Sequence, residues 1–102
     1  MSTYWLHPDA FADLNDIWEF IAQDSVDAAD RVLDEIQKAI NMLVRAPLAG
    51  HLRPDLSSRP MRFWLVHSYL IAYVPEQPLL IIGVLHGRRN PRIMTAILHG
   101  RK

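Results

Sequence analysis

The residues best suited to chemistry gather in one short run near the C-terminal end of the chain, His86-Gly87-Arg88-Arg89-Asn90-Pro91-Arg92. Arginines at the end of a strand can hold phosphates, and a histidine beside them can transfer a proton. Arg62 lies in an earlier apolar segment, from which it could face the same place. The run is therefore interpreted as a contact surface for a macromolecular partner. A catalytic centre and a solvated turn with a structural arginine remain the alternatives.

Other kinds of site find no support in the sequence. No helix carries a histidine pair one turn apart, and there is no glycine-rich phosphate loop and no serine in a nucleophile elbow. Asp13, Asp16 and Glu19 have helical spacing and are interpreted as a solvated helix face. We therefore expect no metal site and no cofactor. The five histidines share no metal-ligand spacing: His7, His51, His67, His86 and His99.

Length and composition indicate a single domain over residues 1–102. The chain has no cysteine, which excludes disulfides and thiolate metal sites and fits a reducing compartment. The first residues lack the basic and apolar regions of a signal peptide, and the longest apolar stretch, Leu79 to Leu85, is too short to span a bilayer. The sequence thus predicts a cytoplasmic protein that does not enter the membrane.

The formal net charge of zero hides an uneven distribution. Residues 1–44 carry nine acidic and two basic side chains, whereas residues 45–102 carry nine basic and two acidic ones. Such asymmetry suggests that the C-terminal half faces an acidic partner, although ordinary helix solvation explains the acidic half equally well.

Two amphipathic helices are predicted in the N-terminal half. Pro8 suits the first position of a helix over residues 8–23, with an apolar stripe at helical spacing. Ser25 is a good N-cap for a second helix that ends near Arg45, before Pro47. The short link between them predicts an antiparallel hairpin. The first stripe comprises Phe11, Leu14, Ile17, Trp18, Ile21 and Ala22.

The C-terminal half has the composition of strands. Residues 46–60 are predicted to be a loop because they contain three prolines and a glycine. Three β-branched and aromatic runs follow at hairpin spacing, over residues 61–66, 69–74 and 79–85, and predict an antiparallel meander. Both faces of these strands are apolar, so the second face needs a cover. Either a short helix after Asn90-Pro91 or a partner could provide it.

With a short strand at Tyr4-Trp5-Leu6, the predicted fold class is α+β with the order β-α-α-β-β-β(-α). Its N-terminal helical hairpin would pack on a mainly antiparallel four-stranded sheet.

Several motifs in this order resemble the toxins of the RelE/ParE superfamily of bacterial type II toxin–antitoxin systems. The first helix reads Ala10-Phe11-Ala12-Asp13-Leu14-Asn15-Asp16-Ile17, and the second is followed by Pro47-Leu48-Ala49-Gly50. Arg62 then enters the meander, Tyr73 lies near the end of its second strand, and Val84-Leu85-His86-Gly87-Arg88-Arg89 ends the third. The similarity covers nearly the whole chain.

The resemblance implies a growth-inhibiting toxin that a cognate antitoxin neutralises. The Pro47–Gly50 segment and the His86–Arg89 ending favour the ParE-like branch, whose members bind DNA gyrase, so plasmid stabilisation is an expected role. RelE-like members instead cleave mRNA on the ribosome, and a non-toxic module that only binds a partner is a third possibility. No direct sequence-specific DNA binding is expected of the toxin alone.

The resemblance and the exposed charge together nominate site residues. No catalytic residue is expected of a gyrase inhibitor; if the chain is a nuclease, the candidates are Arg62, His86 and Arg88. The candidates for binding the target or the antitoxin are Arg62, Trp64, His86, Arg88, Arg89 and Arg92.

Overall fold

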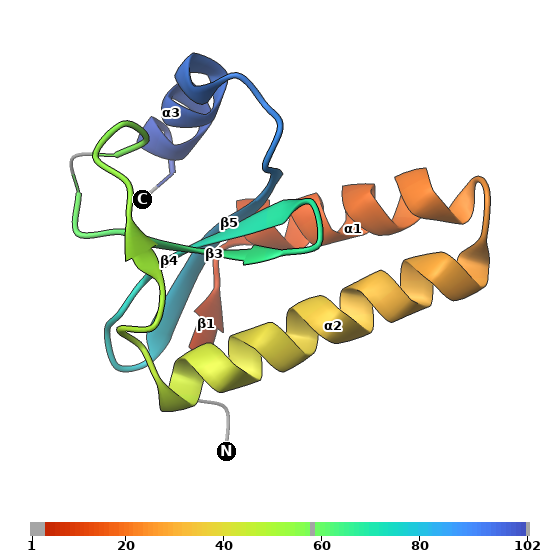
Figure 1. The fold of residues 1–102 in the computed structure, drawn as a ribbon, viewed down its shortest axis with the longest axis horizontal. Coiled ribbons are helices and arrows are strands. Elements are labelled where there is room, and N and C mark those ends of the chain that lie inside the picture. The colour runs from red at the N-terminus through yellow and green to blue at the C-terminus, as the bar shows by residue number, and fades with distance from the viewer. Residues whose placement is uncertain (1–3, 58, 102) are drawn as a thin grey trace.

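The computed structural model describes residues 4–57 and 59–101. The chain forms a five-stranded sheet with a helical hairpin on one face and a short helix on the other (Figure 1). The elements, in chain order, are β1 (Tyr4–Leu6), α1 (Pro8–Ala22), α2 (Val26–Arg45), β2 (His51–Leu52), β3 (Arg62–Val66), β4 (Tyr69–Val74), β5 (Leu79–His86) and α3 (Pro91–His99). The predicted α+β class and element order are confirmed.

The sheet is mixed, with the strand order β1-β5-β4-β3-β2. β3, β4 and β5 form the predicted antiparallel meander, and β1 pairs in parallel with the first part of β5. The fifth strand was not predicted: β2 lies inside the expected loop and pairs antiparallel with β3. Two residues between Gly50 and Arg53-Pro54 are too few to carry a strand pattern, so only the pairing with β3 creates this strand.

The caps of the helices explain why they begin where they do. Ser25 accepts a hydrogen bond from the Ala28 N–H at the start of α2, and the Asn90 side chain does the same for Arg92 in α3. Histidine is a less common cap: at the start of α1, the Nδ1 atom of His7 accepts a hydrogen bond from the Asp9 N–H at 2.9 Å. Each predicted boundary therefore holds to within a residue or so.

The hairpin packs on the larger of two hydrophobic cores. On α1, the residues buried in this core are Ala10 and Ile17. Phe11, which was predicted to be part of the apolar stripe, is 58% exposed. The stripe is thus shifted by one residue around the helix. The buried residues of this core are Ala10, Ile17, Ile36, Ile40, Leu43, Tyr69, Ile71, Tyr73, Leu79, Ile81 and Val84.

The opposite sheet face has a second, smaller core. α3 covers part of it through Met94 and Leu98, so the chain's own tail provides the cover that was predicted for this face. The rest of this core comes from the sheet and from the segment before β3: Leu56, Met61, Phe63, Leu70, Ala72, Ile82 and Leu85. No described helix is both long and apolar enough to cross a membrane.

Candidate functional site

His86 ends β5, and its imidazole is held in a defined orientation. It pairs across the sheet with Tyr69, and the two rings meet edge to face with centroids 5.3 Å apart. The Nδ1 atom accepts a hydrogen bond from the Arg88 N–H at 3.1 Å. Because Nδ1 acts as an acceptor, the neutral ring carries its proton on Nε2.

The three arginines after His86 are exposed at the turn from β5 into α3. Within residues 4–57 and 59–101, no ion pair involves Arg88, Arg89 or Arg92. Asn90 and Pro91 set the start of α3, so the turn leads directly into a helix. The arrangement leaves three cationic side chains available to an anionic partner.

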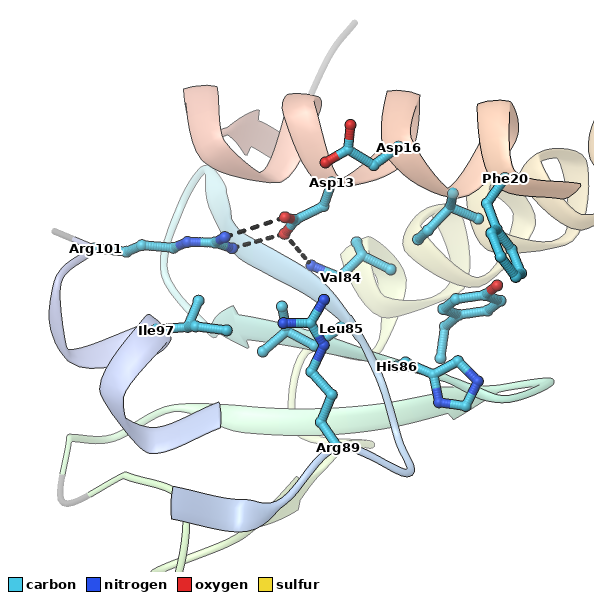
Figure 2. Close-up of a pocket in the computed structure, with 11 residues that line it drawn as sticks. Asp13, Asp16, Phe20, Val84, Leu85, His86, Arg89, Ile97 and Arg101 are labelled. Atoms are coloured by element: carbon cyan, nitrogen blue, oxygen red, sulfur yellow. Dashed lines mark hydrogen bonds and ion pairs between the residues drawn. The ribbon is translucent and has the colours of Figure 1, made fainter. Parts of the chain in front are cut away.

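A cavity of about 370 Å³ lies beside this turn, between α1, β5 and α3 (Figure 2). Asp13 and Asp16 line it from α1, and His86 and Arg89 line it from the strand end. Its apolar wall includes Phe20, which is 69% exposed. The cavity therefore has an acidic and a basic side.

Asp13 was predicted to belong to a solvated helix face, and that prediction is wrong. Its carboxylate accepts from Arg101 Nη1 at 2.6 Å and from Nη2 at 3.0 Å, and from the Val84 N–H at 2.9 Å (Figure 2). The side chains of Asp13 and Arg101 are only 14% and 11% exposed. Asp16 and Glu19, in contrast, are exposed as predicted.

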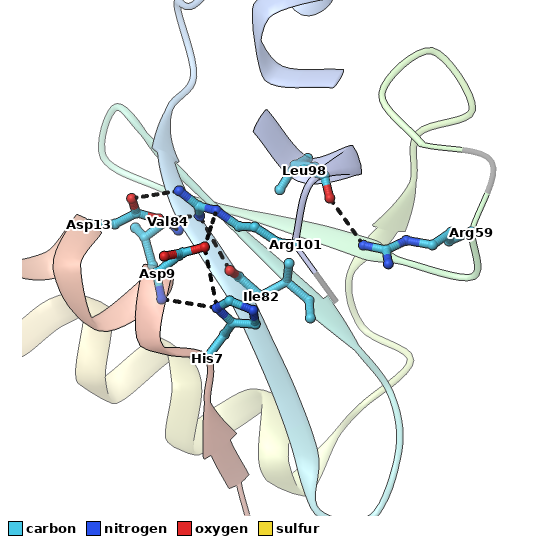
Figure 3. A network of polar contacts seen from close by, with 8 residues as sticks. All are labelled: His7, Asp9, Asp13, Arg59, Ile82, Val84, Leu98 and Arg101. Atoms are coloured by element: carbon cyan, nitrogen blue, oxygen red, sulfur yellow. Dashed lines mark hydrogen bonds and ion pairs between the residues drawn. The ribbon is translucent and has the colours of Figure 1, made fainter. Parts of the chain in front are cut away.

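The Asp13–Arg101 pair takes the place of a strand beside β5. β1 pairs with β5 only as far as Ile81, so the backbone of the next residues lacks a neighbouring strand on that side. Asp13 satisfies the Val84 N–H, and Arg101 Nη1 donates to the Ile82 carbonyl at 3.3 Å (Figure 3). Gly83 permits this, because a Cβ there would collide with Arg101 Nη1.

No sequence signal could have identified this pair, since its members are 88 positions apart. Arg101 lies just beyond α3 and pairs with α1, so the pair fastens the chain end to the hairpin. A third contact strengthens it, because Arg101 Nε lies 3.7 Å from an Asp9 carboxylate oxygen (Figure 3).

Arg62 also has a structural role. Its Nη1 donates to the Gly50 carbonyl at 2.8 Å and to the Leu48 carbonyl at 3.4 Å. The Tyr73 hydroxyl donates to the Pro47 carbonyl at 2.6 Å and accepts from the Gly50 N–H at 2.9 Å. Burial raises the pKa of Tyr73 above its ordinary value, so the hydroxyl keeps its proton. Together these contacts fasten the Pro47–Gly50 segment to the sheet.

Gly50 is required for this fastening. A Cβ at this position would lie 2.5 Å from the Tyr73 hydroxyl oxygen, closer than such atoms approach in proteins. The Pro-x-x-Gly motif thus forms one structural unit with Arg62 and Tyr73, although the three are separate signals in the sequence.

The strand register separates Arg62 from His86, contrary to the expectation that they face the same place. Arg62 pairs with Tyr73 at one end of β3, whereas His86 pairs with Tyr69, which pairs with Val66 at the other end. Four residues of strand separate those ends, about 13 Å. Trp64 is half-buried and packs against the hairpin-side core. The structure therefore brings together His86, Arg88, Arg89 and Arg92, and places Arg62 and Trp64 elsewhere.

A second hollow lies on the sheet face away from the hairpin, beside the part of that face that α3 covers. This groove, of about 330 Å³, is lined by His51, Arg53, Phe63, Leu65, Leu70 and Gly87. Its floor is apolar, and Leu65 is 60% exposed. Of these residues, sequence reasoning included only Gly87, as a member of the His86–Arg92 run. It missed Leu65, because a leucine in an apolar strand is indistinguishable from a core residue.

Among the described residues, no group of three or more histidine, aspartate or glutamate side chains could hold a metal ion. The groups available for function are therefore exposed charges, exposed apolar side chains and the oriented imidazole of His86.

The structure is a small α+β domain with an exposed basic turn, and two comparisons show which known proteins it is similar to. A family model described as the ParE toxin of type II toxin–antitoxin systems, parDE, matches residues 4–91. A solved structure, described as a chromosomal ParDE toxin–antitoxin system from P. aeruginosa, superposes with a TM-score of 0.67 at 18% identity, covering 84% of this chain and 96% of that one. No curated protein sequence matches. The chain belongs to the ParE toxin family.

Proposed function

We propose that this chain is the toxin of a type II toxin–antitoxin pair, that it inhibits DNA gyrase by binding, and that a cognate antitoxin neutralises it in the cytoplasm. Family membership supports the toxin role. The single observation that favours binding over cleavage is the position of Arg62. Its guanidinium is committed to backbone carbonyls, at the opposite end of the meander from His86.

The contact proposed for gyrase is the basic turn of Arg88, Arg89 and Arg92. These side chains are exposed and without an ion pair in the described part of the chain. Positive charge on one surface speeds its encounter with an acidic surface, and added salt weakens this attraction. Inhibition is therefore expected to decrease as ionic strength rises.

The test is a supercoiling assay with purified gyrase, ATP, relaxed plasmid and this protein freed of antitoxin. Wild type is expected to block supercoiling and to accumulate cleaved DNA. Arg88→Ala with Arg89→Ala should weaken the block about tenfold or more, as loss of two interface charges can. Arg31→Ala with Arg45→Ala removes two exposed charges elsewhere and serves as the control. A protein that arrests growth but leaves supercoiling intact would refute the gyrase target.

One observation favours ribosome-dependent mRNA cleavage as a second candidate. His86 has a fixed tautomer and lies with Arg89 in a cavity that also contains Asp16. A histidine, an arginine and a carboxylate can together transfer protons and stabilise a phosphate. This candidate predicts cuts in translated mRNA that His86→Ala abolishes and that the gyrase mechanism would not produce.

A further inference from the structure

The cavity between α1, β5 and α3 contains polar groups that the fold itself does not use (Figure 2). Tyr69 lines the cavity and is only 9% exposed, yet its hydroxyl has no hydrogen-bond partner in the described part of the chain. His86 accepts the Arg88 N–H at Nδ1, which leaves its Nε2–H without an acceptor among the same residues. Because polar groups in such places are normally hydrogen-bonded, both are available to a bound molecule.

Two charged side chains of the cavity are also unpaired. Asp16 lines it from α1, and Arg89 lines it from the turn after β5. Neither forms an ion pair or a side-chain hydrogen bond within residues 4–57 and 59–101. The other two charges, Asp13 and Arg101, neutralise each other. The free carboxylate and the free guanidinium therefore lie on opposite sides of the cavity (Figure 2).

The wall next to Asp16 is aromatic. Phe20 follows Asp16 by one helical turn, so both side chains lie on the same face of α1, and Phe20 is 69% exposed. An exposed aromatic ring can stack on a planar base, and the neighbouring carboxylate can accept hydrogen bonds from the edge of that base. The rest of the wall is apolar and comprises Ile17, Val84, Leu85 and Ile97.

The separation of the two charges restricts the kind of ligand. An α-amino acid carries both of its charges on one carbon, so it does not reach both sides of the cavity. A guanine mononucleotide has its phosphate at one end and two adjacent donors, N1–H and N2–H, at the other, and two adjacent donors match the two oxygens of a carboxylate. The cavity volume of about 370 Å³ is at the lower end of the range for ligand pockets, roughly 300–1,000 Å³, which suits a single nucleotide.

We propose that this cavity binds a free guanine mononucleotide. Asp16 accepts the two N–H groups of the base, Phe20 stacks on its ring, and Arg89 and the His86 Nε2–H donate to the phosphate. The Tyr69 hydroxyl supplies a further hydrogen bond. The inference goes beyond the proposed function, because neither gyrase nor an antitoxin takes part in the binding.

The experiment is isothermal titration calorimetry of the purified full chain, with GMP as the probe and AMP and inorganic phosphate as comparisons. GMP is expected to bind at least about tenfold more tightly than AMP, because the same edge of adenine presents an acceptor to the Asp16 carboxylate and leaves a buried hydrogen bond unmade. Inorganic phosphate is expected to bind about 100-fold more weakly than GMP, because it lacks the base.

One pair of variants tests the base contact. Asp16→Asn replaces one acceptor oxygen with an NH₂ group that faces the donors of guanine, so it should weaken GMP binding about tenfold and remove the preference over AMP. Glu19→Gln is the matched control, because Glu19 is an exposed carboxylate of α1 that does not line the cavity. It should change the affinity less than twofold. An Asp16→Asn variant that still prefers GMP to the same degree would refute the base contact.

A second pair tests the phosphate contact. Arg89→Ala should weaken GMP binding about tenfold and reduce its dependence on salt. Arg92→Ala removes an exposed arginine that does not line the cavity and should do neither. All four substituted residues are exposed, and circular dichroism shows that each variant is folded. Equal effects of Arg89→Ala and Arg92→Ala would mean that only general surface charge attracts the nucleotide.

The remaining outcomes each overturn the inference in a recognisable way. No heat of binding with GMP at about 5 mM would mean that the cavity is no nucleotide site. Equal affinities for GMP and inorganic phosphate would make it a bare oxyanion site. A guanine-containing RNA trinucleotide that binds at least about tenfold more tightly than GMP would assign the cavity to RNA and favour the cleavage candidate. The supercoiling assay tests the proposed gyrase target independently of all these results.

Discussion

The two faces of the sheet differ in how completely the chain covers them. The hairpin face is covered along its length by α1 and α2 and is fastened by two polar units, the Asp13–Arg101 pair and the Tyr73–Gly50–Arg62 contacts. The opposite face is covered by the nine-residue α3 over part of its area only. Both cores stabilise the fold, but the second face also leaves apolar surface at Leu65, near the exposed arginines of the basic turn. Of the two faces, the second is therefore the one where we expect a partner to bind.

The largest effect on stability is expected from breaking the Asp13–Arg101 pair. Asp13→Ala leaves the nearly buried Arg101 guanidinium and the Val84 N–H without their partner, which should cost about 3–5 kcal/mol of unfolding free energy. Asp16→Ala, one turn further along α1 and exposed, should cost less than about 0.5 kcal/mol. Urea unfolding measures both. Equal losses would mean that the pair does not fasten the hairpin face.

A smaller loss is expected from the second polar unit. Tyr73→Phe removes the hydroxyl that bridges the Pro47 carbonyl and the Gly50 N–H, leaving both without this partner, at a cost of about 1–3 kcal/mol. Tyr69→Phe is the matched control, because the described hydrogen bonds do not include the Tyr69 hydroxyl, so its loss should have little effect. Denaturant unfolding of the two variants compares them directly. A Tyr69→Phe loss as large as that of Tyr73→Phe would contradict this role.

Alkaline pH should loosen the hairpin face through the same tyrosine. Burial raises the pKa of Tyr73 above its ordinary value of 10.0, so the folded state holds this proton more tightly than the unfolded state. Its contribution is fully present below pH 10 and is lost as pH rises through the raised pKa. Thermal midpoints measured from pH 9 to 12 should fall more steeply for wild type than for Tyr73→Phe. Parallel profiles would refute the effect.

The smallest effect on stability is expected at the groove. Leu65 is mostly exposed, so Leu65→Asp should change the unfolding free energy by less than about 1 kcal/mol. Phe63→Asp, two residues earlier on the same strand and at a site only 3% exposed, should instead prevent stable folding. Thermal unfolding distinguishes them. A severe loss of unfolding free energy from Leu65→Asp would mean that Leu65 belongs to the core, and the difference between the two faces would not hold.

Most of the fold could be predicted from local signals. The spacing of apolar residues, together with Pro8, Ser25 and Asn90, located all three helices to within a residue or so. The meander followed from its β-branched runs and short connections. β2 could not be predicted, because its two residues become a strand only through pairing with β3. Phe11 was misplaced because helical spacing defines a stripe but not its exact centre.

The candidate site was predictable only in part. The exposed arginines after His86 were visible in the sequence, since a basic run at the start of a short helix is seldom buried. The separation of Arg62 from His86 was not, because it depends on strand register. The groove at Leu65 was equally hidden, since its exposure depends on how far α3 extends over the sheet.

The sequence by itself determined the elements of this protein, their order, the charge difference between its halves and its resemblance to a toxin family, because each of these depends on residue type and near spacing. Tertiary structure alone decided which charges are available. Arg62 and Arg101 are bound to carbonyls and a carboxylate, whereas Arg88, Arg89 and Arg92 face solvent. The physical reason is that a guanidinium pairs with whichever acceptor the folded chain brings within hydrogen-bond reach, however far apart the two residues are in the sequence.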